Sequence, residues 1–319
     1  MKRLRPLIQP FVKPALGALL LAGLVWSTDL DRLLAALKAV SAETFGLALL
    51  ATILANLVCV RRWQVISCSL NVPSRYSFLL ATYAQGISAN SVLPGGVLGG
   101  DVWRSVALAE QAPEGHKAAA PASVFLDRVS GFWGLAWVSL TAGLWVWASG
   151  LPHEASGWLI GPLGLGYLAA LLATLVAPIL LAAVGRPMLQ AWVQSSRGLW
   201  HRACSLLLRI AAGSPQLVKT LGHSVVAQLL TMLAFGLCLA AAGLEVPVPV
   251  LMAVCGGIFL SGVLPASIGG FGARELGAVA FLAPLGFDES LVLTGSVLFG
   301  LTATAQGLLG LVFWFGRRV

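Results

Sequence analysis

Two charged residues, Asp101 and Arg104, follow a glycine-rich stretch of an otherwise apolar chain. The stretch from Gly86 to Arg104 reads GISANSVLPGGVLGGDVWR. Residues three positions apart share one face of a helix, so a helix that restarts after Gly100 can pair this carboxylate with this guanidinium. A guanidinium can also bind a phosphate through two parallel hydrogen bonds, while the carboxylate orients it or changes protonation. The pair therefore suits recognition of an anionic headgroup; a simple ion pair at the membrane interface is the alternative.

The backbone of this stretch is a second candidate for binding. Gly costs about 1 kcal/mol and Pro about 3 kcal/mol per helical position, so a regular helix is not expected here. Irregular backbone at membrane depth needs protein or water as its hydrogen-bond partner. A helix that begins after such a break directs free N–H groups and a positive dipole end toward an anion. We predict a substrate-binding site that includes Asn90, Gly95, Gly96, Gly99 and Gly100; glycines that only permit a tight turn and close packing are the alternative.

A similar stretch occurs 171 residues later, from Gly257 to Glu275, and reads GIFLSGVLPASIGGFGARE. The residues that recur at this spacing are Gly86, Ile87, Val92, Leu93, Pro94 and Gly99. Paired apolar segments that are interrupted by Gly and Pro in two halves of a chain indicate a transporter binding site. The candidate binding residues of the second stretch are Gly269, Gly270, Arg274 and Glu275.

Two further charged residues, Asp127 and Arg128, stand in SVFLDRVSGFWG, where an apolar segment begins. Charged residues inside membrane spans are costly and are commonly functional. Charges at the start of a span can also simply mark the membrane boundary. We list both residues as candidate substrate-binding residues and leave the two interpretations open.

The composition indicates a polytopic helical membrane protein, since 58% of the 319 residues are hydrophobic, 10% are charged, and the mean hydropathy is +0.89. The net charge of +8 comes from basic residues between apolar segments, which argues against a nucleic-acid partner. The sequence contains no GxSxG, HExxH, CxxC or P-loop motif, and its histidines lack the spacing of metal ligands. We therefore expect no enzyme activity, no cofactor and no metal.

We predict an all-α membrane fold with about six full spans and two broken re-entrant helical hairpins. The expected full spans are Ala15–Trp26, Ser41–Val60, Ser123–Ser149, Trp158–Val184, Leu221–Gly243 and Leu291–Phe315. The hairpins fall within Pro73–Lys117 and Val250–Leu285, and either could instead be two short full crossings. The second span is expected to stop at Arg61 and Arg62.

Positive residues set the expected orientation. Cytoplasmic loops are enriched in Lys and Arg, and this rule places both termini in the cytoplasm. All Lys and Arg then lie on the cytoplasmic side except Arg32, Lys38 and Arg274. Residues 185–220 form a basic amphipathic segment that we expect along the inner leaflet. Residues 1–149 and 158–316 become two half-repeats of opposite orientation within a single transmembrane domain, 1–319.

Three motifs resemble the transmembrane flippase region of the lysylphosphatidylglycerol synthase/flippase family. They are NSVLPGGVLGGDVWR (Asn90–Arg104), LDRVSG (Leu126–Gly131) and LPASIGGFGARE (Leu264–Glu275), and the resemblance extends over essentially the whole chain. It implies a flippase-like domain of the bacterial inner membrane that moves an anionic, aminoacylated, polyprenyl- or hopanoid-type lipid between leaflets. By matching position, the candidate roles fall on Asp101, Arg104, Arg128 and Glu275.

The resemblance also has a limit. Family members that aminoacylate phosphatidylglycerol carry a soluble domain after the membrane region, whereas this sequence ends at Val319, so we do not expect the synthase activity. Two alternatives to transport remain. The protein could be a membrane scaffold that presents lipid to a separate synthase or glycosyltransferase, or an integral-membrane lipid transferase with Asp127 or Glu275 as base. The expected partners are a membrane lipid and, among proteins, a second copy of the chain or a lipid-modifying enzyme.

Overall fold

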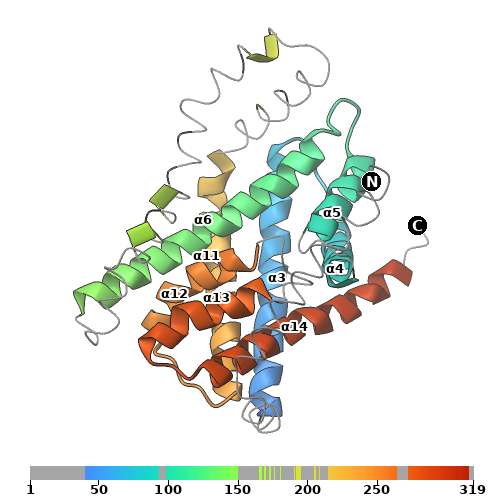
Figure 1. The fold of residues 1–319 in the computed structure, drawn as a ribbon. Helices are drawn as coiled ribbons and strands as arrows, with labels where there is room; N and C mark the ends of the chain where they lie inside the picture. Colours follow the sequence, from blue (N-terminus) through green and yellow to red (C-terminus); the bar gives the residue numbers. More distant parts are fainter. Residues whose placement is uncertain are drawn as a thin grey trace, which may run out of the picture.

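The computed structural model describes residues 40–92, 98–149, 215–263 and 272–315, with isolated positions between 165 and 208. The regular elements of these residues are helices, and they contain no strand. In chain order they are α3 (Ala42–Ser69), α4 (Tyr76–Val92), α5 (Leu98–Gln111), α6 (Ala119–Ala148), α11 (Pro215–Ala241), α12 (Val248–Ser261), α13 (Ala273–Leu282), the short 3₁₀ helix η2 (Ala283–Leu285) and α14 (Glu289–Phe315) (Figure 1). The predicted all-α class is confirmed.

Four of the described helices, α3, α6, α11 and α14, are long and apolar enough to cross a membrane. They coincide with four of the predicted spans. The predicted spans Ala15–Trp26 and Trp158–Val184 lie outside the described residues, apart from isolated helical positions of the latter, and so does most of the basic segment 185–220. Large apolar side chains cover the outer surface of the four helices, as lipid-facing surfaces require; examples are Leu50, Leu144, Trp145, Leu233 and Val312.

The end of α3 differs from the prediction. Ser41 caps its first turn by accepting a hydrogen bond from the Thr44 N–H, and the helix then continues through Arg61 and Arg62 to Ser69. The predicted stop after Val60 is therefore wrong. Arg62 is only 4% exposed and pairs with a carboxylate of another helix, so its charge does not force the chain out of the apolar layer.

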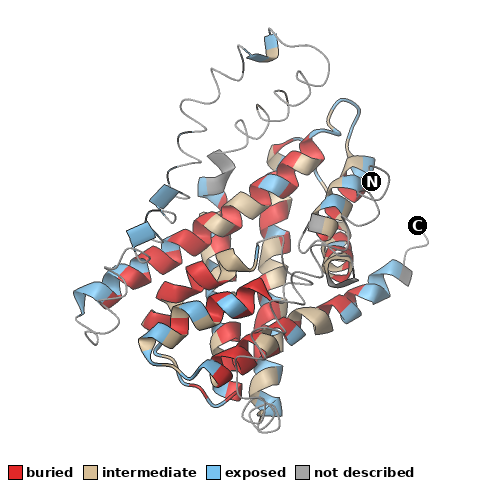
Figure 2. Ribbon diagram, in the orientation of Figure 1, coloured by how far each residue is buried: buried red, intermediate tan, exposed pale blue. Residues whose placement is uncertain are grey.

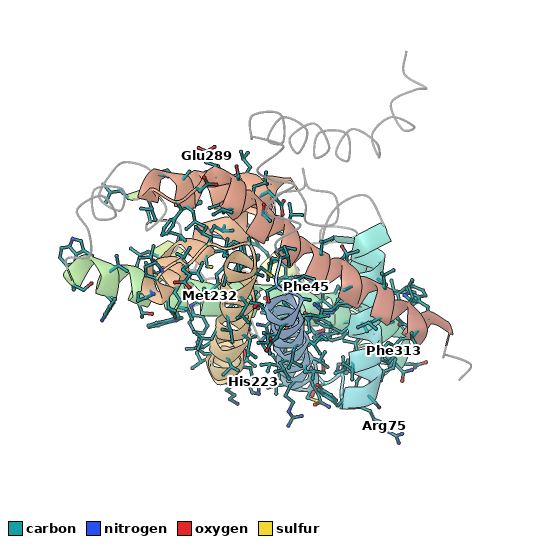
Figure 3. All side chains as sticks on the ribbon, turned by 90° about the horizontal axis from the view of Figure 1, so that it is seen from below. Phe45, Arg75, His223, Met232, Glu289 and Phe313 are labelled. Carbon is teal, nitrogen blue, oxygen red and sulfur yellow. The ribbon has the colours of Figure 1, made fainter. Side chains whose placement is uncertain are left out.

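Helices α3 and α11 form an antiparallel pair in the middle of the molecule. They run side by side in Figure 1 and are both seen nearly end-on in Figure 3. Ala48 near the start of α3 packs with Cys238 near the end of α11, whereas Arg62 donates a hydrogen bond to Ser224 near the start of α11. Helix α14 runs across the view in Figure 3, from Glu289 to beyond Phe313.

Two pairs of short helices correspond to the predicted broken segments. Helices α4 and α5 pack together as the first helix pair, and α12 and α13 as the second. At 1.5 Å per residue they are about 25, 21, 21 and 15 Å long, all shorter than a hydrocarbon core of about 30 Å. The connections, residues 93–97 and 264–271, lie outside the described residues.

Buried apolar residues fill two main clusters between the helices. One joins α3, α4, α5 and α6 through side chains such as Trp63, Leu79 and Leu126. The other joins α6 to α11, α12, α13 and α14 and is centred on residues such as Phe235 and Ile258. Figure 2 shows buried residues where helices meet and exposed ones at their outer faces. The first cluster surrounds the charged site described below.

Candidate functional site: a buried cluster of arginines and carboxylates

The start of α5 is fixed by a close crossing with α4. The Gly100 N–H donates to Asn90 Oδ1 over 2.6 Å, so the α4 side chain satisfies one of the free donors at the α5 N-terminus. A Cβ atom at Gly100 would clash with the Gly86 carbonyl oxygen and with the Asn90 amide. Glycine at position 100 therefore permits the approach of the two backbones, and α5 then carries Asp101 and Arg104 in its first turns.

Asp101 binds two arginines from different helices. Arg128 of α6 donates from Nε to Oδ2 and from Nη2 to Oδ1, each over 2.8 Å, which is a bidentate pair. Arg104 Nη1 lies 3.5 Å from Asp101 Oδ1. The predicted pairing of Asp101 with Arg104 on one helix face is confirmed, and Arg128 is the stronger partner.

Asp127 of α6 links Arg104 to a third guanidinium group, that of Arg62. Arg104 Nη2 donates to Oδ2 and Arg62 Nε donates to Oδ1, both over 2.8 Å. Arg62, Asp101, Arg104, Asp127 and Arg128 thus form one continuous network, called the arginine cluster below. Its three guanidinium groups and two carboxylates carry a net charge of +1.

Aromatic rings enclose the middle of the arginine cluster. The Arg104 guanidinium lies 4.1 Å from the Trp63 ring centroid and 4.5 Å from that of Tyr83, so both rings can contribute cation–π attraction. Arg104 Nε is buried and has no hydrogen-bond partner among the described residues. The cluster therefore retains an unused donor beside its excess positive charge.

The members of the arginine cluster on α3 and α6 lie well inside their helices, whereas Asp101 and Arg104 lie in the first turns of α5. Arg62 is seven residues from the end of α3 at Ser69, and Asp127 is eight residues from the start of α6 at Ala119. At 1.5 Å per residue these separations correspond to about 10–12 Å. Asp127 and Arg128 thus stand inside a continuous helix, and both take part in ion pairs.

Burial within the arginine cluster is graded. The side chains of Asp127 and Arg104 are 1% and 3% exposed, whereas those of Asp101 and Arg128 are 20% and 36% exposed. A ligand can thus reach the bidentate pair first. Serine hydroxyl groups contact the buried end of the cluster. Arg62 donates a hydrogen bond to Ser224, and Ser224 shares a hydrogen bond with Ser130.

The second helix pair holds a smaller site. Glu275 is fully buried and pairs with its neighbour Arg274. Its other oxygen, Oε2, accepts a 2.6 Å hydrogen bond from the N–H of Gly272, whose positive φ of 105° suits glycine. Ser296 of α14 donates to Oε1 over 3.3 Å. Glu275 thereby caps its own helix α13, and the site carries no net charge.

The structure brings most of the predicted site residues of the first half together, whereas the described residues of the second half, Arg274 and Glu275, pair with each other. Seven predicted residues of the first half lie at or beside the arginine cluster: Asn90, Gly99, Gly100, Asp101, Arg104, Asp127 and Arg128. Arg274 and Glu275 form the separate site. Gly95, Gly96, Gly269 and Gly270 lie outside the described residues.

Arg62 is the member of the arginine cluster that sequence reasoning missed. Two adjacent arginines, Arg61 and Arg62, are typical of the cytoplasmic end of a span. The side chain of Arg62 is buried, whereas that of Arg61 is exposed. A signal was available, because Ala48, Ala55 and Arg62 are spaced by seven residues and occupy one face of α3. Small residues at that spacing indicate a face packed against other helices.

Metal binding has no support in the described part of the chain, where no group of three or more His, Cys, Asp or Glu side chains could hold a metal ion. The described charges instead form guanidinium–carboxylate pairs inside apolar helices. Such an arrangement defines a polytopic membrane protein with a positively charged interior site.

A comparison with protein families gives the same class. The model for the lysylphosphatidylglycerol synthase TM region matches residues 11–310, so the chain belongs to this family, as its motifs predict. A search of curated protein sequences gave no match.

Proposed function

We propose that this protein is a lipid transporter of the bacterial inner membrane that moves a phosphate-bearing lipid between leaflets. The observation that carries the proposal is the arginine cluster, which places a net positive charge about 10 Å inside apolar helices with one end partly exposed. Uncompensated charge in such a place is costly, and its persistence points to an anionic ligand. Membership of the family supports a role with membrane lipids.

In the proposed mechanism the headgroup meets the exposed end of the arginine cluster. Arg128 offers its planar fork to the phosphate, which competes with the Asp101 carboxylate for the same donors. Arg104, which is more deeply buried than Arg128, then supplies further positive charge. The apolar tails stay in the bilayer against the exposed side chains of the helices.

The proposed alternation between leaflets uses two half-repeats of opposite orientation. The helix bounds support a repeat: shifted by 171 residues, α3 becomes 213–240 and α4 becomes 247–263, close to the observed α11 and α12. The contacts support it as well, since α4 packs on α14 as α12 packs on α6, and α5 packs on α6 as α13 packs on α14. The antiparallel course of α3 and α11 agrees with an inverted relation.

Helix α14 can couple the two helix pairs. Ser88 of α4 donates to the Gly307 carbonyl of α14 over 2.6 Å, and Gln85 donates to the Phe313 carbonyl over 2.7 Å. Ser296, near the other end of α14, contacts Glu275 of the second helix pair. A displacement of one pair would therefore be transmitted to the other through a single rigid helix.

The test is leaflet exchange of acyl-chain-labelled phospholipids in proteoliposomes, with wild type beside Arg128→Gln. Arg128 is partly exposed, so its neutralisation should leave the fold intact, and a removed charged contact is worth at least roughly a tenfold loss of rate. Arg75→Gln removes an equal charge at an exposed position and should exchange lipid as wild type does. If every anionic, aminoacylated and polyprenyl lipid exchanges no faster with the protein than without it, transport is contradicted and the scaffold function is favoured.

A further inference from the structure

We infer that the arginine cluster selects a headgroup that carries one phosphate diester and no ammonium group. This inference rests on the proposed function and narrows its substrate class. An aminoacylated lipid, the other class that the family membership suggests, is then a poor substrate.

The first step is the charge that a ligand must bring. The arginine cluster holds three guanidinium groups and two carboxylates, and all of these are engaged in ion pairs with one another. A single negative charge would bring the site to neutrality. In a low-dielectric interior, uncompensated charge is strongly disfavoured, so a monoanion suits the site better than a zwitterion or a cation.

The second step is the supply of acceptors for an ammonium group. Among the acidic residues that the structure describes, only Asp101, Asp127 and Glu275 lie away from exposed positions, and each is bound to at least one arginine. The others, Glu43, Glu110, Glu114, Glu245, Asp288 and Glu289, are exposed. At the arginine cluster, an ammonium that entered with the headgroup would therefore meet positive charge, and each buried carboxylate of the described residues is already paired with an arginine.

The third step is the supply of donors for a phosphate. Arg128 presents a bidentate fork that is 36% exposed, and Arg104 has a buried Nε without a hydrogen-bond partner. A phosphate diester offers two unbridged oxygens with one shared negative charge, which match a guanidinium fork. Donors for the anion are thus present where acceptors for a cation are lacking.

The test compares lipids that differ only in headgroup charge. Wild-type protein in neutral phosphatidylcholine vesicles receives acyl-chain-labelled phosphatidylglycerol, phosphatidylethanolamine or lysylphosphatidylglycerol in separate reactions. We expect phosphatidylglycerol to exchange at least roughly tenfold faster than the other two lipids. Their ammonium groups would place an unfavourable positive charge beside the arginine cluster, and about 1.4 kcal/mol of such cost corresponds to a factor of ten. Equal or faster exchange of the lysyl lipid would overturn the inference while leaving lipid transport intact. Exchange of none of the lipids would contradict the proposed function itself.

Variants at Arg128 separate charge from geometry. Arg128→Gln should reduce phosphatidylglycerol exchange and leave the slower lipids unchanged, so that selectivity collapses. Arg128→Lys keeps the charge without the fork and should retain the preference at a lower rate. A selectivity ratio that stays the same in Arg128→Gln would show that this end of the arginine cluster does not read headgroup charge.

A soluble anion could satisfy the same donors, and a binding experiment distinguishes the sources. Purified protein is heated in a neutral detergent with short-chain phosphatidylglycerol, with glycerophosphoglycerol or with inorganic phosphate. A raised unfolding midpoint with the lipid alone supports a bilayer source. An equal rise with the soluble diester would overturn the assignment to a lipid. Arg128→Gln should abolish either rise, whereas Arg75→Gln should not.

Discussion

Each helix pair consists of two short helices, and the two pairs differ in their chemistry. At the first pair, Asp101 of α5 joins a network with side chains of two neighbouring helices, in which two carboxylates connect arginines from α3, α5 and α6. In the second, the charges are the adjacent residues Arg274 and Glu275 of one short helix, supported by the backbone of Gly272. The first arrangement carries a net charge of +1 and the second is neutral.

This difference indicates how one architecture can divide its tasks. A cluster assembled from three helices changes whenever those helices move, so its charges can bind a ligand and respond to it. A pair held within one helix turn moves as a unit with that turn. In the proposed function, substrate recognition therefore falls to the arginine cluster of α3, α5 and α6, whereas the contacts of Arg274 and Glu275 with Ser296 hold α13 against α14.

The largest expected effect comes from removing a shared carboxylate. Asp127→Asn leaves Arg62 and Arg104 buried without their common counter-charge, and breaking such pairs costs about 3–5 kcal/mol. The thermal unfolding midpoint in detergent should fall strongly, whereas the exposed Glu114→Gln should leave it unchanged. Glu275→Gln keeps an oxygen for the Gly272 N–H and should cost less than Asp127→Asn. The opposite order would break the contrast between the two helix pairs.

A smaller effect is expected at the helix crossings. Gly100→Ala places a methyl group against the Gly86 carbonyl, a backbone atom, and should cost about 1–3 kcal/mol. Gly257→Ala instead meets the ring of Phe281, a side chain that can rotate, and should cost less. Gly46→Ala in α3 has open space and serves as the control. A lower unfolding midpoint for Gly257→Ala than for Gly100→Ala would contradict the importance of the first crossing.

The smallest effect is expected from the side chain that caps α5. Asn90→Ala removes the acceptor of the Gly100 N–H and should cost about 1 kcal/mol, as the loss of other helix caps does. Asn90→Asp keeps the acceptor and should recover most of the stability. Chemical or thermal unfolding of the purified variants measures both. Equal losses in the two variants would show that the hydrogen bond contributes nothing.

Much of the fold was predictable because each long helix is a continuous apolar segment. The predicted spans 123–149 and 291–315 agree with α6 and α14 to within a few residues. The Gly- and Pro-rich stretches also predicted that two apolar segments are interrupted. The expectation of no regular helix from Gly86 to Arg104 is wrong, because α4 continues to Val92 and α5 already begins at Leu98. The end of α3 was not predictable in this way, because the rule that arginines stop a span assumes that their charge stays in water.

The sequence by itself determined the helical membrane class, the family, and the two broken segments, since these depend on local composition and on motifs within short stretches. It also determined the pairing of Asp101 with Arg104, which follows from helical spacing alone. Only the tertiary structure decided that Arg62 and Asp127, 65 residues apart, share an ion pair, and that Arg128 binds Asp101. Those pairings depend on how α3, α5 and α6 pack, which no local pattern specifies, and they set the charge of the site.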